Sequence, residues 1–521
     1  MKNTTSYRAF ELGFVAALAT ALLSPSHAAA KFNRAFAPQD GLVAPVEKPY
    51  RSEICLNGSW QFQPVALPAG YERGQSQLPA LSAPLNDHWE KTPIRIPSPW
   101  NVNSFPDDQM LGGDFRTYPS YPDSWKNVQM GWLRRTFTVP ASWRGKRLIL
   151  HFDAVAGNTQ IVVNGKVVGG HDDNFLPFDI DVTEAAKVGG ANTLLVGVRK
   201  SSLMDVPGKF GRRLYQGGSF WGQHVAGIWQ DVFLTAVPLV RVDNVFVKPQ
   251  VDKGILEAEL TLRNDSDHAV KVGVDGEVKA WLSQNKNDVL SAPEVSWKLG
   301  ATALKAPRVA ATVPARGSVI VTLKAPAGGK LKQWKPGQPN LYGFVSSLET
   351  SDKRVSDTKY TRFGWRQLKF QDGKVLLNGQ PIQLKGDSWH FMGIPQMTRR
   401  YAWAWYKACQ DANLNAVRLH AQPYPAFYMD MADEMGFFIL DESAIWASDG
   451  GPKLDDAAYW ANTSAHIKGL VLRDRNHPSV FGWSVSNEVM AVIKNVFHGP
   501  KEMQEELVRH FKIWADVCRE N

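Results

Sequence analysis

The order of predicted elements after residue 363 constrains the fold of this chain most strongly. Strand-like and helical segments alternate there four times. The strand-like segments are PIQLKGDS, NAVRLH, FFILDES and SVFGWSVS, and the helical ones are RRYAWAWYKACQDANLN, AFYMDMADEMG, DAAYWANTSAHIKGLVLRDRN and KEMQEELVRHFKIWADV. Because a crossover helix returns the chain to a parallel strand, this alternation predicts a parallel sheet. Apolar strands that end in polar residues are typical of a (β/α)8 barrel, which carries its chemistry at the carboxyl ends of its strands.

The number of units indicates that the barrel is incomplete. Four strand–helix units are about half of an eight-unit barrel, and the chain ends at Asn521. We therefore expect the first half of a barrel over residues 366–521. A sheet of four such strands has unpaired edges, so we expect either a fragment or another chain that supplies the remainder. In the last helical segment, apolar residues share one face at helical spacing: Met503, Leu507, Phe511 and Trp514.

Two all-β regions precede the predicted barrel. Residues 31–240 contain short alternating strands separated by Gly, Pro and Asn, which is typical of a sandwich. Asn164-Gly165 lies between two strand-like runs, and this pair predicts a tight hairpin because both turn residues need positive φ. Residues 241–365 show the same alternation over the length of an immunoglobulin-like sandwich.

The first 30 residues have the pattern of a secretory signal peptide. Lys2 and Arg8 precede the apolar run Leu12 to Leu23, and small residues follow it. The run is too short to span a bilayer, although an uncleaved short anchor is the alternative. We therefore expect an exported protein, periplasmic or extracellular, with no membrane span.

Charge and cysteine content exclude other classes of protein. The formal net charge is +9, but the 59 Lys and Arg are interspersed with 50 Asp and Glu, and no basic run resembles a nucleic-acid-binding arm. The three cysteines, Cys55, Cys409 and Cys518, are far apart and fit neither a disulfide framework nor a zinc site. Cys409 is expected in the core.

Polar residues stand at the carboxyl ends of all four predicted barrel strands. In chain order they are Asp387 and His390, Arg418 and His420, Asp441 and Glu442, and Asn487 and Glu488. For any single pair, a structural ion pair is the simpler interpretation. Four consecutive strands that end this way favour a binding site, because loops that only connect elements do not need buried charge.

Glu488 is the strongest catalytic candidate. If neighbours such as Trp483 desolvate it, its carboxyl group would hold a proton near neutral pH and give it to a leaving oxygen. Retaining glycoside hydrolysis needs two such groups about 5 to 5.5 Å apart, one as acid and one as nucleophile. Trp389 and Trp446 follow strand ends, where they would either stack on a sugar or pack in the core.

Ordered motifs over most of the chain resemble glycoside hydrolase family 2, which includes β-galactosidases, β-glucuronidases and β-mannosidases. LNGSWQF, IRIPSPWN, GWLRRTFTVP, VVNGKVVGGH and GIWQDVFL resemble its sugar-binding jelly-roll domain, and FGWRQLKF, KVLLNGQPIQLKG, NLNAVRLH and NHPSVFGWSVSNEV resemble its catalytic barrel. The resemblance implies three domains: a jelly-roll sandwich, an immunoglobulin-like sandwich and the first half of the barrel.

The resemblance also implies roles for individual residues. Glu488 matches the general acid/base, Asn487 the contact to the 2-hydroxyl of the sugar, and Arg418 the arginine that orients the nucleophile. His390 matches a histidine that contacts substrate, and Asp387 and Trp389 lie in the same segment.

The chain departs from the family pattern at three points. His420 follows Arg418 by two residues, whereas the family spacing is three. Glu442 matches an acidic position that helps to organise a metal in some members, but the accompanying ligands are not evident; no cofactor is expected, with a divalent metal as the alternative. The family nucleophile belongs to a later strand, and the glutamates after Glu488 lie in or after one helix. We therefore expect no nucleophile in this chain.

The leading hypothesis is an exo-acting retaining β-glycosidase, β-galactosidase-like and incomplete in this chain, with a carbohydrate as its substrate. An inverting reaction between Glu488 and Asp387 or Glu442, which accepts a gap of about 6.5 to 9.5 Å, is a minor alternative. A secreted carbohydrate-binding protein without catalysis and an adhesion module are the others. The sequence leaves the sugar and the oligomeric state open.

Overall fold

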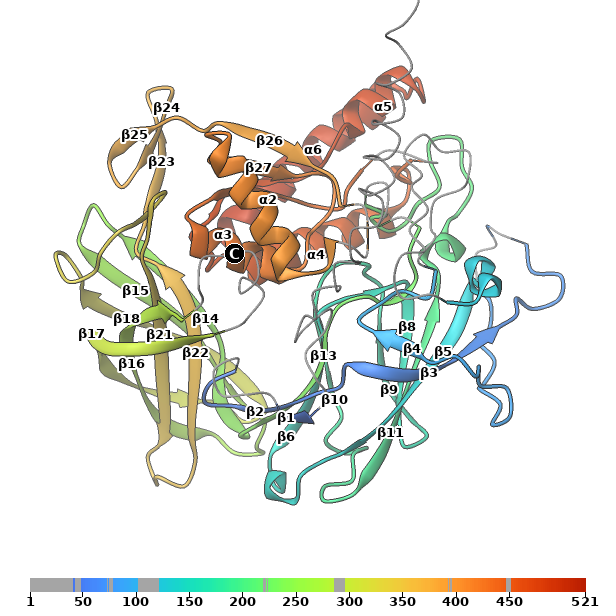
Figure 1. The fold of residues 1–521 in the computed structure, drawn as a ribbon, viewed down its shortest axis with the longest axis horizontal. Helices are drawn as coiled ribbons and strands as arrows, with labels where there is room; N and C mark the ends of the chain where they lie inside the picture. Colours follow the sequence, from blue (N-terminus) through green and yellow to red (C-terminus); the bar gives the residue numbers. More distant parts are fainter. Residues whose placement is uncertain are drawn as a thin grey trace, which may run out of the picture. The chain divides into compact units, whose positions relative to one another are not determined.

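A computed structural model describes most of the chain (Figure 1). The described residues are 41–42 (backbone alone), 48–72, 74, 78–101, 121–218, 222, 224–284, 296–391, 393, 396–446 and 451–521. The chain divides into two compact units, 1–35 and 36–521, and every described residue belongs to the second. The predicted signal peptide over residues 1–30 lies outside the described residues. Among the described helices, none has the length and apolar character needed to cross a membrane.

The first domain consists mainly of two antiparallel sheets. One has the order β1 (Gly41–Leu42), β2 (Ser52–Cys55), β13 (Val232–Val237), β6 (Arg147–Phe152), β10 (Phe178–Asp181), and the other β4 (Ile94–Ile96), β3 (Gly58–Val65), β5 (Met130–Thr138), β11 (Ala191–Arg199), β8 (Asn158–Val163), β9 (Lys166–His171). A small sheet pairs β7 (Val155–Ala156) with β12 (Gly227–Ile228), and 3-10 turns cover Asp123–Asn127, Ala141–Trp143 and Ser201–Met204. Asn164 (φ 50°) and Gly165 (φ 82°) connect β8 to β9, which confirms the predicted hairpin.

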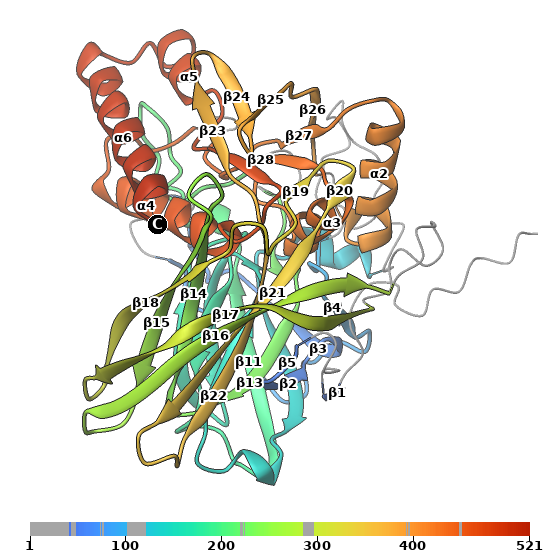
Figure 2. The ribbon, with the colours of Figure 1, turned by 90° about the vertical axis from the view of Figure 1, so that its left-hand side faces the viewer.

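The second domain is the predicted immunoglobulin-like sandwich (Figure 2). Its sheets have the orders β14 (Val240–Gln250), β15 (Ile255–Asn264), β18 (Gly317–Pro326) and β17 (Trp297–Val313), β16 (Val270–Ser283), β21 (Leu341–Thr350), β22 (Ser356–Gly364). Along β15, buried residues alternate with more exposed ones for nearly the whole strand, as expected when one face packs on a core. Short pairings follow: β19 (Trp334–Lys335) with β20 (Gln338–Pro339), and β23 (Leu368–Gln371) with β24 (Lys374–Leu377) and β25 (Gln380–Ile382).

The third domain is a partial barrel with one parallel sheet, as predicted. Its strands run in the order β26 (Gly386–Trp389), β27 (Ala416–Leu419), β28 (Phe438–Glu442), β29 (Val480–Ser484). The helices are α2 (Arg399–Asp411), α3 (Ala426–Met435), α4 (Ala457–Asp474), α5 (Val489–Asn495) and α6 (Lys501–Glu520). Helix α5 was not predicted from the sequence.

Local capping explains where the barrel helices begin and end. The Thr398 hydroxyl accepts from the Tyr401 N–H at the start of α2, and Asp456 accepts from the Ala458 N–H at the start of α4. Gly436, at φ 70°, ends α3. The two N-caps satisfy backbone N–H groups at the starts of α2 and α4, and Gly436 lets the chain reverse from α3 into β28.

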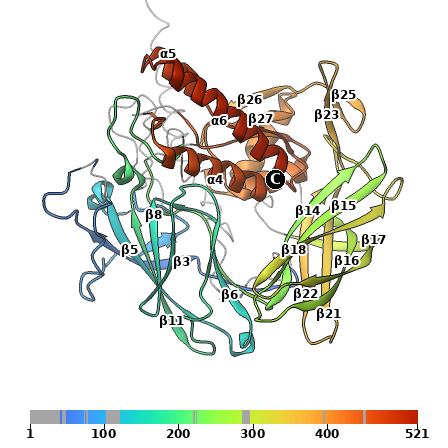
Figure 3. The ribbon, with the colours of Figure 1, turned by 180° about the vertical axis from the view of Figure 1, so that it is seen from behind.

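Helices α4 and α6 lie side by side (Figure 3). Leu507 and Trp514 on α6 are fully buried, and Met503 and Phe511 are partly buried in the same cluster, which confirms the predicted apolar face. The buried Cys409 on α2 also lies in the core, as expected.

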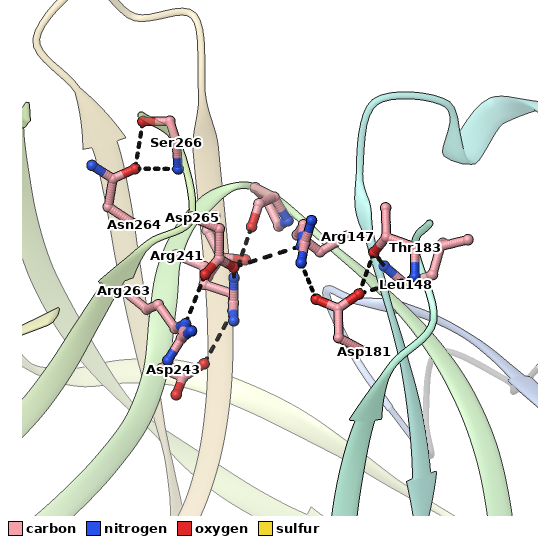
Figure 4. Close-up of polar contacts among 12 residues, drawn as sticks. Arg147, Leu148, Asp181, Thr183, Arg241, Asp243, Arg263, Asn264, Asp265 and Ser266 are labelled. Atoms are coloured by element: carbon pink, nitrogen blue, oxygen red, sulfur yellow. Dashed lines mark hydrogen bonds and ion pairs between the residues drawn. The ribbon is translucent and has the colours of Figure 1, made fainter. Parts of the chain in front are cut away.

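Charged residues join the first two domains (Figure 4). Arg147 on β6 pairs with Asp181 on β10, and its Nε also lies 3.9 Å from Asp265, which follows β15. Arg241 on β14 donates to the same Asp265 carboxylate at 2.5 Å. The Asp265 carboxylate therefore pairs electrostatically with an arginine from each domain.

The barrel contacts both sandwiches. Arg362 on β22 donates to Asp430 at 2.5 Å and to Glu434 at 2.9 Å, both on α3. Trp229 of the first domain packs against Phe391, which follows β26, with ring centroids 5.9 Å apart. The three domains thus share buried contacts around the partial barrel.

Candidate active site

One guanidinium group connects three of the four barrel strands at their carboxyl ends. Arg418 on β27 donates from Nε to Oε2 of Glu442 at 2.7 Å and from Nη2 to Oε1 at 2.8 Å. The same Nη2 donates to Oδ1 of Asn487, which follows β29, at 2.6 Å. Because parallel strands end at one edge of the sheet, side chains that are distant in sequence meet there. The structure thus brings together three residues that the sequence analysis selected.

The Glu442 side chain holds Arg418 in this position. Its side chain is fully buried, and besides Arg418 it accepts from the Ala421 N–H at 2.5 Å and from the Ser484 hydroxyl. A fork-to-fork pair of this kind fixes the plane of the guanidinium as well as its position. Both carboxylate oxygens are used in this way, so the chemistry of Glu442 here is that of an arginine-orienting residue.

The described residues offer one candidate metal-ligand group, and it lies elsewhere. Asp430, Asp433 and His477 have ligand atoms within 4.8 Å of one another. Arg362 donates to both aspartates, and His477 Nδ1 lies 2.6 Å from Asp433. The guanidinium therefore already provides the positive charge that an ion would bring to this cluster.

Asn487 presents an unused donor beside Arg418. The residue is 6% exposed, and within the described part of the chain its buried Nδ2 has no hydrogen-bond partner. A buried amide without a partner costs about 1–3 kcal/mol, so such a group is a strong candidate for contact with a ligand. Its Oδ1 is held by Arg418, which leaves the amide nitrogen facing outward from that contact.

Glu488 differs from the sequence expectation in one respect. We expected Trp483 and the strand to desolvate it, but its side chain is exposed, and Trp483 is itself only partly buried. The physical reason is that β29 is an edge strand of the described sheet, and just one of its five residues is fully buried. Among the described residues, the Glu488 carboxyl group has no hydrogen-bond or ion-pair partner.

The backbone at Glu488 is nevertheless specialised. Its φ of 56° and ψ of 9° lie in the left-handed region, and its carbonyl accepts from the Val492 N–H at 3.0 Å at the start of α5. A non-glycine residue in this region costs about 1–3 kcal/mol unless its surroundings impose it, and such residues concentrate at functional sites. Ala421, whose N–H donates to Glu442, has a similar φ of 51°.

His390 and His420 form a pair next to Arg418. Their ring centroids are 4.2 Å apart. Burial, the neighbouring His390 and the charge of Arg418 lower the pKa of His420 to about 4, against the opposing charges of Glu442 and Glu488. Burial and Arg418 also lower the pKa of His390. Both imidazoles are therefore neutral near pH 7, where each ring offers one donor and one acceptor suited to sugar hydroxyls.

The other predicted site residues have different surroundings. Asp387 is exposed and accepts from the Ser388 N–H at 2.7 Å. Trp389 is 2% exposed, and Trp405 stacks on its ring at 3.4 Å, so packing is the role that the structure shows for it. Trp446 is partly buried and meets the His420 ring edge-on at 6.0 Å.

Asp441 lies on the opposite face of β28 from Glu442, because successive strand residues point to opposite sides. It is fully buried, and among the described residues its carboxyl oxygens have no partner within hydrogen-bond geometry. Burial and the charge of Asp474 raise its pKa well above the usual range. The Asp441 carboxyl group faces Asp474 at the end of α4, away from Arg418.

Several residues that support the site were not predicted from the sequence. Ser484 and the Ala421 N–H both donate to Glu442. The polar residue that ends β29 could have suggested Ser484, but the turn that aims the Ala421 N–H has no local sequence pattern. Asp173 and His466, described below, come from different domains.

The described domains correspond in order to those of one enzyme family. The sugar-binding domain of glycosyl hydrolases family 2 matches residues 54–238, a second domain of glycosyl hydrolases family 2 matches residues 240–366, and its TIM barrel domain matches residues 368–513. The chain belongs to glycoside hydrolase family 2. The β-galactosidase of Priestia megaterium (strain DSM 319 / IMG 1521) is 25% identical over 464 residues, covering 83% of this chain and 41% of that protein.

Other family 2 proteins show the same partial coverage. The β-galactosidase of Pseudoalteromonas haloplanktis is 25% identical, over 83% of this chain and 40% of its own length. The crystal structure of a Bacteroides uniformis β-glucuronidase superimposes with a TM-score of 0.68 at 22% identity, over 90% of this chain and 51% of that chain. A β-glucuronidase from Ruminococcus gnavus in complex with D-glucuronic acid superimposes with a TM-score of 0.61 at 20% identity, over 93% of this chain and 73% of that chain. These structures share the fold, and the chain spans about two fifths of the length of the two β-galactosidases.

Proposed function

We propose that this chain carries the acid/base side of the active site of an exo-acting retaining β-glycosidase, with β-galactosides as the first substrate class. The observation that supports this best is the arrangement of Arg418, Glu442 and Asn487, which leaves the buried Asn487 Nδ2 without a partner next to Glu488. The β-galactosidases among the relatives support the choice of sugar.

In this proposal Glu488 gives its proton to the leaving oxygen and then, as a carboxylate, activates the water that completes hydrolysis. Its exposed side chain becomes desolvated when the sugar covers it, and this favours the protonated acid. Asn487 Nδ2 donates to the 2-hydroxyl, a contact that strengthens in the transition state. We assign no residue of this chain as the nucleophile.

The remaining polar groups have positioning roles. The Arg418 guanidinium, held in one plane by Glu442, places positive charge where a second carboxylate would be oriented. His390 and His420 are neutral near pH 7 and can exchange hydrogen bonds with sugar hydroxyls without adding charge. Trp446, beside His420, is the aromatic residue best placed to contact a sugar ring.

A panel of p-nitrophenyl β-glycosides tests the proposal, together with calorimetric binding of galactose. The panel contains the galactoside, glucuronide, mannoside and N-acetylglucosaminide. We expect galactose binding that Asn487→Ala weakens at least about tenfold, because the variant removes the free donor. Hydrolysis of the galactoside supports the enzyme. Binding without any hydrolysis favours the alternative, a secreted carbohydrate-binding protein, and no binding of any of these sugars contradicts both.

We also infer that the protein is exported to the periplasm or the extracellular space. The basic start, the apolar run from Leu12 to Leu23 and the small residues after it support this inference. Mass spectrometry of the protein purified from its native host should give an amino terminus near residue 29 or 31. An intact Met1 on cytoplasmic protein would contradict it.

A further inference from the structure

The segment Ser443–Trp446 extends β28 beyond its assigned end. The Ser443 N–H donates to the Ser484 carbonyl at 3.0 Å, and the Asn487 N–H donates to the Ile445 carbonyl at 2.9 Å. The Ser443 hydroxyl also donates to the Val485 carbonyl at 2.7 Å. This segment therefore fixes the backbone of the chain that leads into Asn487 and Glu488.

Ala444 forms its backbone hydrogen bonds on the other side of the same segment. In an extended chain, consecutive residues direct their N–H and C=O groups to opposite edges. The Ala444 N–H donates to Nε2 of His466 on α4 at 3.0 Å, and the Ala444 carbonyl accepts from the Gly218 N–H at 3.0 Å. A side chain of the barrel and a backbone group of the sugar-binding domain thus occupy the edge where another strand would pair.

These contacts determine the tautomer of His466. A backbone N–H can only donate, so Nε2 must be the unprotonated acceptor. The proton is then on Nδ1, which lies 2.7 Å from Oδ2 of Asp173 in the sugar-binding domain. His466 is 2% exposed, so no bulk water substitutes for either contact.

Asp173 is itself held in place. Its Oδ1 accepts from the N–H groups of Phe175 at 2.7 Å and Leu176 at 3.0 Å, and its Oδ2 accepts from Gln216 Nε2 at 2.6 Å. Burial opposes ionisation, but His466 and the Phe175 N–H lower the pKa of Asp173 overall. The carboxylate can therefore accept from Nδ1 while its own position is fixed by the local backbone.

We propose that His466 is a positioning residue, held by Asp173 as the Nδ1–H tautomer, that fixes Ser443–Trp446 and thereby aligns Asn487 and Glu488. The sugar-binding domain then takes part in the geometry of the acid, through Asp173 and Gly218. The role of Glu488 as the acid rests on the proposed function. The coupling between the backbone of 443–446 and that of 485–489 does not depend on it.

Two matched variants separate this role from simple core packing. In His466→Asn, the amide nitrogen replaces Nδ1 and still reaches Asp173, but no acceptor remains at the place of Nε2. In His466→Gln, the side-chain oxygen can reach the place of Nε2 and accept from the Ala444 N–H. Both changes keep a polar amide, so a difference between the two variants reports on the acceptor.

Hydrogen–deuterium exchange of the full chain, followed by mass spectrometry, is the measurement, because it requires no hydrolysis. In His466→Asn we expect exchange at least about tenfold faster in peptides that cover 443–446 and 485–489, and in His466→Gln exchange within about twofold of the unaltered chain. A peptide from β15 is the internal reference, and His510→Asn on α6 is the control variant.

Asp173→Asn is a second variant, which leaves α4 unchanged. An amide at position 173 can donate to Nδ1 and so favour the wrong tautomer, in which Nε2 carries the proton and cannot accept from Ala444. We expect faster exchange in the same two peptides. The proposal is wrong if His466→Asn and His466→Gln behave alike, if 485–489 remains protected when 443–446 opens, or if Asp173→Asn leaves both peptides unchanged. Sugar binding and hydrolysis do not enter these readouts, so the proposed function can fail independently.

Discussion

At the scale of single residues, the site depends on hydrogen bonds that fix the plane of Arg418. Its guanidinium group reaches Glu442 through two nitrogens and Asn487 through one, which a lysine could not reproduce. The sequence could identify these residues because all three stand at or next to strand ends. It could not reveal the exposure of Glu488, which depends on how the edge strand β29 is covered.

The pKa of His420 predicts a pH effect on stability. The ordinary value is about 6.5 in the unfolded chain and about 4 in the folded protein. Between these values the unfolded state binds a proton that the native state does not, so this residue lowers stability as the pH falls from about 6.5 to about 4. His420→Gln removes the effect.

Urea unfolding of both proteins at several pH values measures this difference. Between pH 7 and pH 4, we expect the free energy of unfolding of the unaltered chain to fall by about 1 kcal/mol more than that of His420→Gln. This figure is reduced from the full pKa difference because His420 is only partly buried. The exposed His268, changed to Gln, is the matched control. If the difference in unfolding free energy between the unaltered chain and His420→Gln were the same at every pH, the lowered pKa of His420 would be contradicted.

At the scale of elements, the strand–helix alternation predicted the parallel sheet well because each element has a strong period of its own. The short helix α5 was missed because its seven residues follow directly from the left-handed Glu488 and have no polar capping side chain. The pairing of Asp173 with His466 was equally hidden, since 293 residues separate them in sequence.

Helix α6 gives a prediction at this scale. Leu507 is fully buried against α4, whereas the adjacent Val508 is 56% exposed. Leu507→Ala should lower the free energy of unfolding by about 2–5 kcal/mol through a lost side chain and a residual cavity. Val508→Ala should change it by less than about 0.5 kcal/mol. Chemical denaturation measures both, and equal effects would show that α6 does not pack as described.

At the scale of the whole molecule, charged residues at the domain boundaries couple the three domains. Arg362 pairs with Asp430, Asp433 and Glu434 on α3. Burial alone would lower the pKa of Arg362, but these carboxylates raise it overall. The sequence indicated three domains, but the partners across their boundaries depend on tertiary packing that no local pattern encodes.

Removing this arginine should uncouple the second domain from the barrel. Arg362→Met leaves Asp433, which is 1% exposed, with less compensation, and breaking such a buried network costs about 3–5 kcal/mol. We expect the calorimetric transition to separate into two components, or its first component to move to lower temperature. Arg308 lies on the same sheet but is 49% exposed, so Arg308→Met should lower the free energy of unfolding by no more than about 1 kcal/mol. An unchanged transition for Arg362→Met would rule out this coupling.

The central claim is that Glu488 is the proton donor of a glycosidase. The dependence of the hydrolysis rate on the leaving group of the substrate tests this claim most directly. Hydrolysis of dinitrophenyl and phenyl β-galactosides is compared for the native gene product, Glu488→Gln and the exposed control Glu505→Gln. Glu488→Gln should slow hydrolysis of the phenyl galactoside by about 10²–10⁴-fold, because this leaving group needs a proton. Hydrolysis of the dinitrophenyl galactoside should slow far less, because the better leaving group needs no proton. Glu505→Gln should match the native protein. Equal losses for both substrates, or unchanged turnover in Glu488→Gln, would contradict the assignment.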